Sequence, residues 1–166
     1  MANFDHDNVV PYKDSALDKK GQVAEMFNDI SGKYDLLNRL LSGGIDLHWR
    51  KKALSHLKSI KPQNLLDVAT GTADVAIMAH KQLKIPSIIG IDISDGMLDL
   101  GRKKIKSLGF ENNITLHNGD SEAIKHPDNS FDAVTVAFGV RNFQQLEKGL
   151  SGLLATPLSF NTESGI

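Results

Sequence analysis

Two short stretches of the sequence carry groups with which the chain could bind a nucleoside. The first is a turn of small residues, 69–73, with Gly71 at its centre, which follows the apolar run 64–68. The second is the apolar run 87–92, which ends in Asp92. Small residues let the backbone approach a ligand closely, and a carboxylate can accept hydrogen bonds from both hydroxyls of a ribose. The spacing therefore predicts a nucleoside site in the first half of a parallel sheet.

Each of these features has a structural alternative. The turn could serve only the tight packing of a strand against a helix, since alanine stands at two of its alternate small positions, Ala69 and Ala73. Asp92 could cap the next helix, although Ser94 already stands at that N-cap position. Asp120 follows the third predicted strand and could either reach the exocyclic amine of an adenine or lie in a surface loop.

The residues after the turn bear on the kind of nucleoside. A dinucleotide site favours a third glycine, so that a pyrophosphate sits at the helix N-terminus, but here Ala73 and Asp74 follow. A carboxylate would repel a pyrophosphate, whereas the amine and the sulfonium of S-adenosylmethionine would tolerate it. This contrast favours S-adenosylmethionine over NAD as the cofactor.

Alternating strand and helix patterns surround these residues. Short apolar runs predict four strands, at 64–68, 87–92, 113–117 and 131–137. Helical spacing follows the turn and again follows Ser94, and Gly109 stands where the second of these helices should end. This order predicts an α/β fold with a parallel, Rossmann-like sheet and right-handed crossovers. Because the carboxyl ends of parallel strands share one edge, the loops after the strands should form one crevice.

About sixty residues of helical pattern precede the first strand. Three helices are expected, over 16–30, 34–41 and 46–60, with an interruption at 31–33 and Asp46 as the N-cap of the last helix. Such a lead-in could form a lid or one wall of a substrate pocket. The apolar repeat of the last helix consists of Trp49, Ala53, Leu57 and Ile60.

The composition is that of an ordinary soluble domain. The chain has 166 residues, 40% of them hydrophobic, and its formal net charge of −1 creates no overall field that would attract nucleic acid. The basic stretches 50–52 and 102–104 are interpreted as solvated helix faces. The chain has no cysteine, which excludes disulfides and thiolate chemistry, and no metal site is predicted. Since no apolar stretch could span a bilayer and the N-terminus lacks a signal-peptide pattern, a cytoplasmic enzyme is expected.

Several motifs together resemble those of one enzyme family. The segments 67–74 and 91–97 are similar to the first two motifs of class I S-adenosylmethionine-dependent methyltransferases. The narrower resemblance is to the menaquinone/ubiquinone biosynthesis C-methyltransferases, and it runs from about Tyr12 to Leu150. The segments that carry it are Tyr34-Asp-Leu-Leu-Asn38, Leu41-Ser42, Gly44-Ile45, Trp49-Arg50 and Phe138-Gly-Val-Arg-Asn142.

This resemblance implies a reaction and a set of site residues. The family methylates a ring carbon of a demethylated, reduced quinone with a polyprenyl tail, which implies transient contact with a membrane surface. Arg141 and Asn142 would orient the quinol and stabilise its oxyanion, and Tyr34 and Asp35 would close over the cofactor. Many members have serine where this chain has Ala137. The residues that would hold S-adenosylmethionine are Gly71, Thr72, Asp92, Asp120, Ser121 and Ala137.

Other functions stay open alongside this one. A class I methyltransferase for another small molecule shares the cofactor half, because the fold does not determine the substrate. An NAD-dependent oxidoreductase and a cofactor-binding fragment without activity are further alternatives. The missing third glycine and the carboxylate of Asp74 count against the oxidoreductase.

The resemblance ends near Leu150. The family continues through a basic turn into three more strands, whereas residues 151–166 contain Pro157 and one charged residue, Glu163. We expect this tail to be foreign or out-of-frame sequence, with the last strands missing and the fourth strand left as an open edge. The predicted organisation is a flexible arm (1–15), a helical lead-in or lid (16–61), an incomplete S-adenosylmethionine-binding core (62–150) and an atypical tail (151–166).

Overall fold

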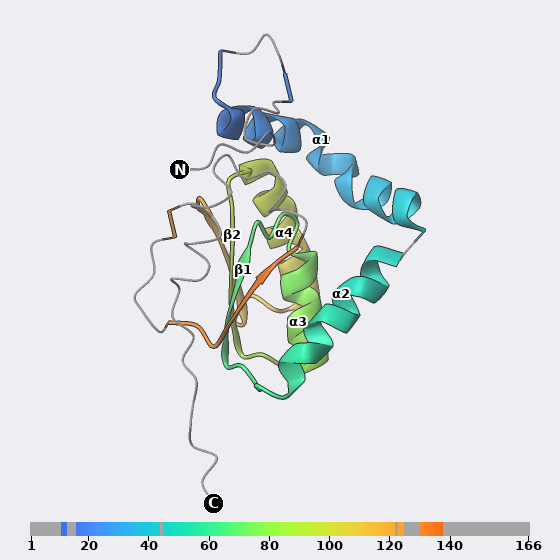
Figure 1. Cartoon of the computed structure of the whole chain (residues 1–166), viewed down its shortest axis with the longest axis vertical. Helices are drawn as coiled ribbons and strands as arrows, with labels where there is room; N and C mark the ends of the chain where they lie inside the picture. Colours follow the sequence, from blue (N-terminus) through green and yellow to red (C-terminus); the bar gives the residue numbers. More distant parts are fainter. Residues whose placement is uncertain (1–10, 13–15, 44, 122, 125–129, 138–166) are drawn as a thin grey trace, which may run out of the picture.

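A parallel sheet forms the centre of the computed structural model, which describes residues 11–12, 16–43, 45–121, 123–124 and 130–137. Four strands lie in the order β3-β2-β1-β4 (Figure 1). The predicted α/β class with a parallel, Rossmann-like sheet is confirmed. The strands are β1 (Asn64–Val68), β2 (Ser87–Asp92), β3 (Ile114–Asn118) and β4 (Ala133–Val136).

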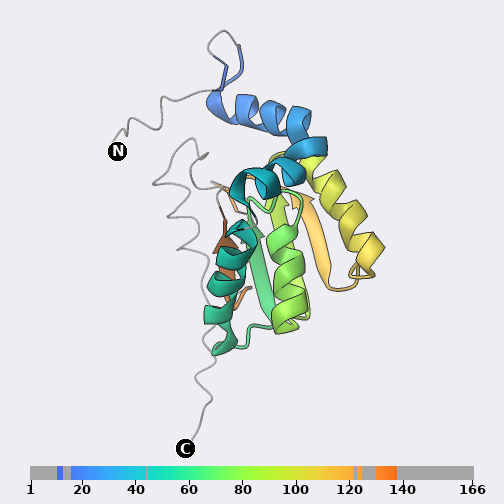
Figure 2. The ribbon, with the colours of Figure 1, turned by 90° about the vertical axis from the view of Figure 1, so that its right-hand side faces the viewer.

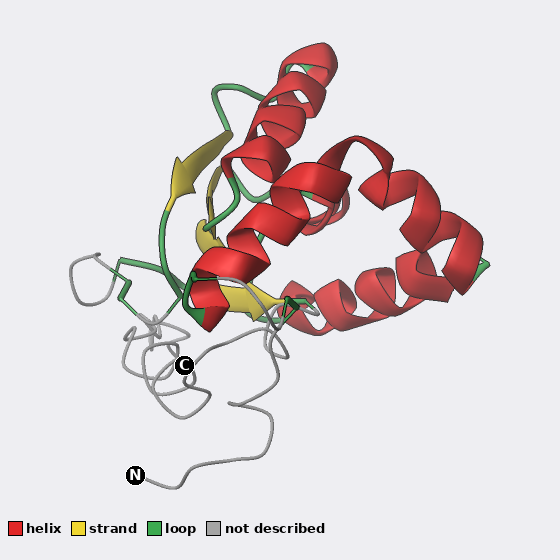
Figure 3. Ribbon diagram, turned by 90° about the horizontal axis from the view of Figure 1, so that it is seen from above, coloured by secondary structure: helices red, strands yellow, loops and turns green. Residues whose placement is uncertain are grey.

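The helices that flank the sheet gather on one of its faces. Figure 2 shows α2, α3 and α4 side by side in front of the strands, and Figure 3 shows the same arrangement from above. Leu54 of α2, Ala76 of α3 and Leu98 of α4 are buried in one cluster with Leu65 of β1 and Ile88 of β2. None of the described helices is long and apolar enough to cross a membrane. The helical segments are α1 (Lys19–Ser42), α2 (Ile45–Ser55), the short 3₁₀ helix η2 (His56–Lys58), α3 (Asp74–Leu83) and α4 (Asp95–Leu108).

The opposite face of the sheet carries a smaller apolar cluster. Leu66 and Val68 of β1 and Ile91 of β2 are buried in it. Val134 and Val136 of β4 pack against them and are partly buried. Both faces of the sheet are therefore apolar, as is usual for a parallel sheet.

Two predictions for the helical lead-in are wrong. α1 is one continuous helix, so there is no interruption at 31–33. A single glycine, Gly32, costs a helix only about 1 kcal/mol relative to alanine, and the packing of α1 on α4 outweighs this cost. Asp46 is not an N-cap, because it lies inside the first turn of α2. Its buried carboxylate instead accepts a hydrogen bond from Ser42 Oγ at 2.7 Å.

Of the apolar repeat predicted for the last lead-in helix, Leu57 alone lies on the inner side, so the repeat does not mark the buried face of α2. Leu54 is 2% exposed, whereas Trp49 is 58% exposed and Ile60 is 48% exposed. Arg50 and Leu57 accompany Leu54 on the inner side and are partly buried. Each residue advances an α-helix by about 100°, so the shift by one position from Trp49 to Arg50 turns the tryptophan outward.

Helix α4 begins and ends as predicted. Ser94 is its N-cap and accepts a hydrogen bond from the Met97 amide at 3.3 Å. Gly109 is its C-cap in the left-handed conformation, with φ of 70°. Both boundaries depend on local hydrogen bonds and backbone geometry, which is why the residue types alone predicted them.

Gly90 of β2 lies where the turn after β1 folds back onto the sheet. A Cβ atom at this position would lie 2.6 Å from Leu116 Cδ2 and 2.9 Å from the side chain of Thr70. We expect Gly90→Ala to lower the free energy of unfolding by about 2 kcal/mol, because Thr70 cannot move without breaking its hydrogen bond to Asp67. Urea denaturation measures this change. Gly32→Ala is the control: nothing lies within 4 Å of a Cβ there, so a gain of about 0.5–1 kcal/mol is expected. Equal changes in the free energy of unfolding for Gly90→Ala and Gly32→Ala would contradict the close contact of position 90 with Leu116 and Thr70.

Candidate functional site

The turn between β1 and α3 has a left-handed backbone at alternate residues. Ala69, Gly71 and Ala73 have φ values of 53°, 56° and 65°. The Thr70 amide donates to the Ile91 carbonyl of β2 at 3.0 Å, which brings the turn over the neighbouring strand. The turn thus lies at the carboxyl ends of the strands, where this class of sheet binds ligands.

Asp92 at the end of β2 joins the two loops predicted to bind a nucleoside. Its Oδ2 accepts a hydrogen bond from the Gly71 amide at 2.8 Å, and its Oδ1 accepts one from the Ser94 amide at 2.9 Å. Burial raises the pKa of Asp92, while its backbone hydrogen bonds oppose the rise. A carboxylate offers about four acceptor sites, so capacity remains for a ribose hydroxyl. The ribose contact stays a prediction, and the alternative role as helix cap is filled by Ser94.

A second carboxylate lies beneath the turn. Asp67 of β1 is 1% exposed and accepts hydrogen bonds from Thr70 Oγ1 and Thr135 Oγ1, both at 2.7 Å. Burial raises the pKa of Asp67 to about 6, although both hydroxyls and the charge of Arg50 lower it. Asp67 therefore connects β1, the turn and β4. Sequence reasoning missed this role, for which the signal was a charged residue inside an otherwise apolar strand.

The free energy of unfolding should depend on pH through Asp67. The pKa of Asp67 is about 6 in the folded state, above the ordinary value of 3.8. Between these two pH values, Asp67 is protonated in the folded protein and ionised in the unfolded protein. The stabilisation is complete below about pH 4 and is lost as pH rises through about 6, a loss on the order of 3 kcal/mol. Asp67→Asn should remove this dependence. Urea denaturation of both proteins from about pH 4 to about pH 7 tests it, and parallel pH profiles would count against it.

A network of charged side chains packs behind the turn, between α2, α3 and α4. Asp74 Oδ1 accepts a hydrogen bond from Lys104 Nζ at 2.7 Å, and its Oδ2 lies 3.2 Å from Arg50 Nη1. Arg50 Nη2 also lies 3.5 Å from Asp46 Oδ2. Two cations thus compensate the charge of Asp74, so the argument that this carboxylate would repel a pyrophosphate does not hold. The interpretation of Arg50 and Lys104 as part of solvated helix faces is also wrong.

Thr72 faces this network. Its side chain is 3% exposed, and its Oγ1 accepts a hydrogen bond from Lys104 Nζ at 2.8 Å. The hydroxyl therefore accepts a hydrogen bond from α4, and the predicted contact of Thr72 with the cofactor stays a prediction. The backbone of Thr72 forms part of the turn.

Helix α1 contacts the loops that follow β2 and β3. Lys20 Nζ lies 2.6 Å from Asp120 Oδ2. Asn28 Oδ1 accepts hydrogen bonds from Ser94 Oγ at 2.7 Å and from the Gly96 amide at 2.9 Å. These contacts hold α1 across the carboxyl ends of the strands (Figure 2), as a lid would require. The lid itself stays a prediction.

A cavity of about 430 Å³ adjoins Asp120. Its apolar lining comes from Ile91, Ala123 and Ile124, and its polar lining comes from residues 117–120. The apolar side chains provide surfaces for a flat ring, and the Asp120 carboxylate can accept a hydrogen bond from an exocyclic amine. Together with Asp92, these residues fit the adenosine part of S-adenosylmethionine.

Of the remaining predicted site residues, the structure describes Ser121 and Ala137. Ser121 directly follows Asp120, and Ala137 follows β4, where it packs partly buried against the main core cluster. Among the residues that the structure describes, no group of three or more His, Cys, Asp or Glu could hold a metal ion. Outside the described part lie the side chains of Tyr34 and Asp35, the predicted catalytic residues Arg141 and Asn142, and the tail 151–166.

Curated relatives resemble the chain over most of its length. The demethylmenaquinone methyltransferase of Bacteroides fragilis is 46% identical over 149 residues, which cover 90% of this chain and 60% of the relative. The ubiquinone/menaquinone biosynthesis C-methyltransferase UbiE of Geobacter sulfurreducens is 45% identical over 141 residues, or 83% of this chain and 55% of the relative. The chain thus spans somewhat less than two thirds of the length of these relatives.

Solved structures share the fold at low sequence identity. The [4+2]-cyclase SpnF has a TM-score of 0.70 at 17% identity and covers 84% of this chain and 57% of its own. A putative S-adenosylmethionine-dependent methyltransferase from Methanococcus maripaludis has a TM-score of 0.64 at 18% identity, with coverage of 89% and 64%. These likenesses support the class I methyltransferase fold.

The family model that matches the chain extends over residues 14–155, close to the span over which the motifs predicted a resemblance. The predicted family is therefore confirmed, and S-adenosylmethionine is the cofactor that goes with it. The motifs on either side of the turn at 69–73 thus identified the right group of enzymes. The chain belongs to the ubiE/COQ5 methyltransferase family.

Proposed function

We propose that this protein transfers a methyl group from S-adenosylmethionine to a ring carbon of demethylmenaquinol, a reduced quinone with a polyprenyl tail. Its family and its 46% identity to a demethylmenaquinone methyltransferase support this reaction. The observation that carries the cofactor half is the Asp92 carboxylate, held at the end of β2 by the Gly71 amide. The cavity beside Asp120 supports an adenosine ligand at the same edge of the sheet.

The chain's own residues bind and orient the reactants in this proposal. Asp92 accepts a hydrogen bond from the ribose, and Asp120 accepts one from the adenine amine. The left-handed turn around Gly71 lets the backbone approach the cofactor closely. Arg141 stabilises the quinol oxyanion and Asn142 orients the ring, as the family resemblance implies. When bound, S-adenosylmethionine would supply an electrophilic methyl group to the ring carbon; the carbon–sulfur electron pair would stay on S-adenosylhomocysteine, and the ring proton would pass to water.

The proposed substrate also determines where the reaction takes place. A polyprenyl tail stays in the bilayer, so the protein would meet its substrate at the membrane surface, from the cytoplasmic side. The contact would be transient and peripheral.

Two measurements test this function. Calorimetry should show binding of S-adenosylmethionine to the 166-residue chain and none of NAD. Transfer of a labelled methyl group to demethylmenaquinol then tests the reaction, with the Bacteroides fragilis relative as positive control. Tighter binding of NAD would indicate an oxidoreductase instead. Transfer to other phenols but not to demethylmenaquinol would assign a different small-molecule substrate.

A further inference from the structure

The segment that forms α2 and η2 is strongly basic. From Leu47 to Leu66 the sequence contains no Asp or Glu, although the whole chain has a formal net charge of −1. Arg50 is engaged with Asp74 and Asp46. The other cations of this segment are exposed, and they are Lys51, Lys52, Lys58 and Lys61.

Exposed apolar side chains lie among these lysines. Ile45 is 61% exposed and Trp49 is 58% exposed. Ile45, Trp49 and Lys52 share one face of α2, because they are spaced four and three residues apart. Lys52 Nζ lies 5.5 Å from the centroid of the Trp49 ring. Lysines beside exposed tryptophan and isoleucine are typical of a helix that lies at a membrane interface. We name the exposed surface of α2 and the segment after it the α2 basic face; Lys51 lies on its flank toward α3, about 200° around the helix from Trp49. Its residues are Ile45, Trp49, Lys51, Lys52, Lys58 and Lys61.

A large hollow separates this face from α3. It has a volume of about 550 Å³, and its rim includes Lys51 and Lys58 from one side and Lys81 from α3. Leu47 of α2 and Ile77 and Met78 of α3 provide its apolar lining. The hollow thus combines positive charge at its edge with an apolar floor.

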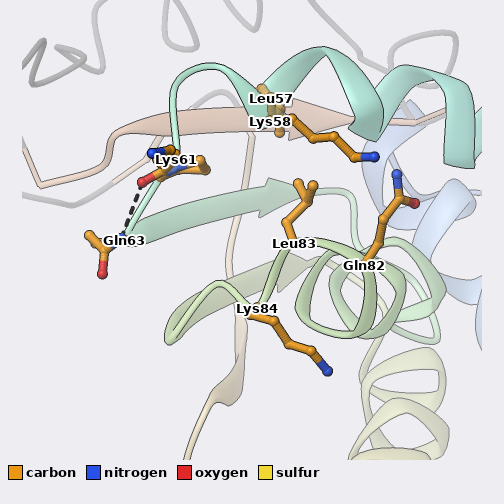
Figure 4. A pocket seen from close by; sticks show the side chains of 8 residues that line it. Leu57, Lys58, Lys61, Gln63, Gln82, Leu83 and Lys84 are labelled. Atoms are coloured by element: carbon orange, nitrogen blue, oxygen red, sulfur yellow. Dashed lines mark hydrogen bonds between the residues drawn. The ribbon is translucent and has the colours of Figure 1, made fainter.

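A smaller hollow continues the same seam toward the start of β1. Its volume is about 250 Å³, and it is lined by Lys58, Lys61 and Lys84 together with Leu57 and Leu83. Figure 4 shows Lys58 extending from η2 along this seam, with Lys61 and Lys84 on other parts of the wall. Lys58 lines both hollows, so the two hollows share one of their lysines.

Among the described residues that border the larger hollow, the single acidic one, Asp74, does not cancel this charge. Asp74 is already paired with Arg50 and with Lys104. The ligand that complements the seam is therefore anionic at one end and apolar at the other. Anionic phospholipids, with a charged headgroup and apolar acyl chains, have this chemistry.

We propose that the α2 basic face and its seam with α3 dock the protein onto anionic phospholipid headgroups of a membrane. The choice of a bilayer rests on the proposed function, because a polyprenyl quinol is held there. Each lysine near an anionic bilayer contributes about 1 kcal/mol, or about a fivefold increase in partitioning. Trp49 and Ile45 insert at the level of the headgroups, and Arg50 on the inner side of α2 connects the docked helix to Asp74 at the start of α3.

The single tryptophan of the chain makes this docking directly observable. On titration with vesicles that contain anionic phosphatidylglycerol, the fluorescence of Trp49 should shift to shorter wavelength. Vesicles of phosphatidylcholine alone should produce little shift. Binding of equal strength to both kinds of vesicle would overturn the proposal. Loss of vesicle binding in millimolar inorganic phosphate would also overturn it, because that result indicates a site for free phosphate. Binding of a single-stranded oligonucleotide without binding of vesicles would overturn it as well.

Charge variants locate the docking surface. K51E/K58E should weaken partitioning onto phosphatidylglycerol vesicles by about 30-fold or more, since two contributions of about fivefold are lost. The matched control is K103E/K106E, which makes the same charge change on exposed residues of α4 and should alter partitioning far less. Equal losses in both variants would contradict a defined docking face. K51Q/K58Q removes the charges without reversing them and serves if the first variant does not fold.

The docking and the proposed reaction can fail separately. Vesicle binding requires no methyl transfer, and transfer to a water-soluble quinol with a shortened tail requires no vesicle. Activity on the short-tailed quinol without vesicle binding would overturn the docking and leave the reaction standing. Vesicle binding without methyl transfer to any quinol would overturn the proposed reaction and leave the docking standing.

Discussion

Replacing Asp92 by alanine should weaken the binding of S-adenosylmethionine by about 100-fold. The carboxylate is the acceptor proposed for the ribose, and hydrogen bonds to a charged group contribute about 1.5–3 kcal/mol each. The substitution also leaves the Gly71 and Ser94 amides without their acceptor, which loosens both loops. Calorimetric titration measures the change in affinity. Asp95→Ala is the matched control, because Asp95 is exposed and lies in the first turn of α4.

A ligand that lacks one hydroxyl separates the ribose contact from the role of Asp92 in the loops. S-adenosylhomocysteine and its 2′-deoxy analogue should differ in affinity for the wild-type protein and differ much less for Asp92→Ala. This coupling between ligand and side chain is what a direct contact produces. If the two ligands differ by the same factor in both proteins, Asp92 only holds the loops together.

Removing the guanidinium of Arg50 should cost about 2–3 kcal/mol of unfolding free energy. Arg50 is 11% exposed and lies between Asp46 and Asp74, with the charge of Asp67 also nearby. Arg50→Met leaves partly buried carboxylates without this cation, which costs more than the loss of an exposed pair. Urea denaturation gives the free energy. An NMR titration should also show the pKa of Asp67 rising further, since the charge of Arg50 lowers it.

An exposed ion pair on α4 provides the comparison for Arg50. Arg102 Nη1 lies 2.7 Å from Asp99 Oδ1, and the two side chains are 45% and 65% exposed. Arg102 Nη2 also donates a hydrogen bond to the Leu116 carbonyl at 3.1 Å, so Arg102→Met should cost about 1 kcal/mol, which is still less than the loss expected at Arg50. If the Arg50 and Arg102 variants lose equal stability, the network behind the turn is no stronger than a surface ion pair.

The sequence predicted best those parts of the fold that depend on neighbouring residues. The strand ending at Val68, the N-cap Ser94 and the C-cap Gly109 follow from short-range patterns, and the structure confirms them. Gly71 and Asp92 were predicted for the same site, and they meet at 2.8 Å. That meeting is long-range in sequence, but the topology of a parallel sheet brings successive strand ends to one edge.

The parts that failed depend on packing between distant segments. Nothing near Asp74 in sequence indicates that Arg50 and Lys104 will compensate its charge, since they come from two other helices. The outward position of Trp49 depends on which side of α2 the sheet accepts. A residue type cannot indicate this, because apolar residues lie on both sides of the helix.

The contacts of α1 with the site had no local signal either. Lys20 is paired with Asp120 across one hundred positions, and Asn28 reaches Ser94 across sixty-six. A lysine and an asparagine in a helical pattern are usually assigned to solvent. Only an alignment of relatives or the fold itself could distinguish them from surface residues.

The left-handed alanines of the turn have a consequence for the entropy of binding. Glycine at position 69 or 73 would relieve a strain of about 1 kcal/mol per residue. It would also give the turn more conformations from which a ligand must select one. With Ala69 and Ala73, and with hydrogen bonds from the turn to Asp67 and Asp92, the backbone bears this strain before any cofactor arrives. A cofactor that binds to this turn therefore loses little affinity to the ordering of the backbone. The entropy of ordering the turn is lost when the chain folds, before the cofactor binds.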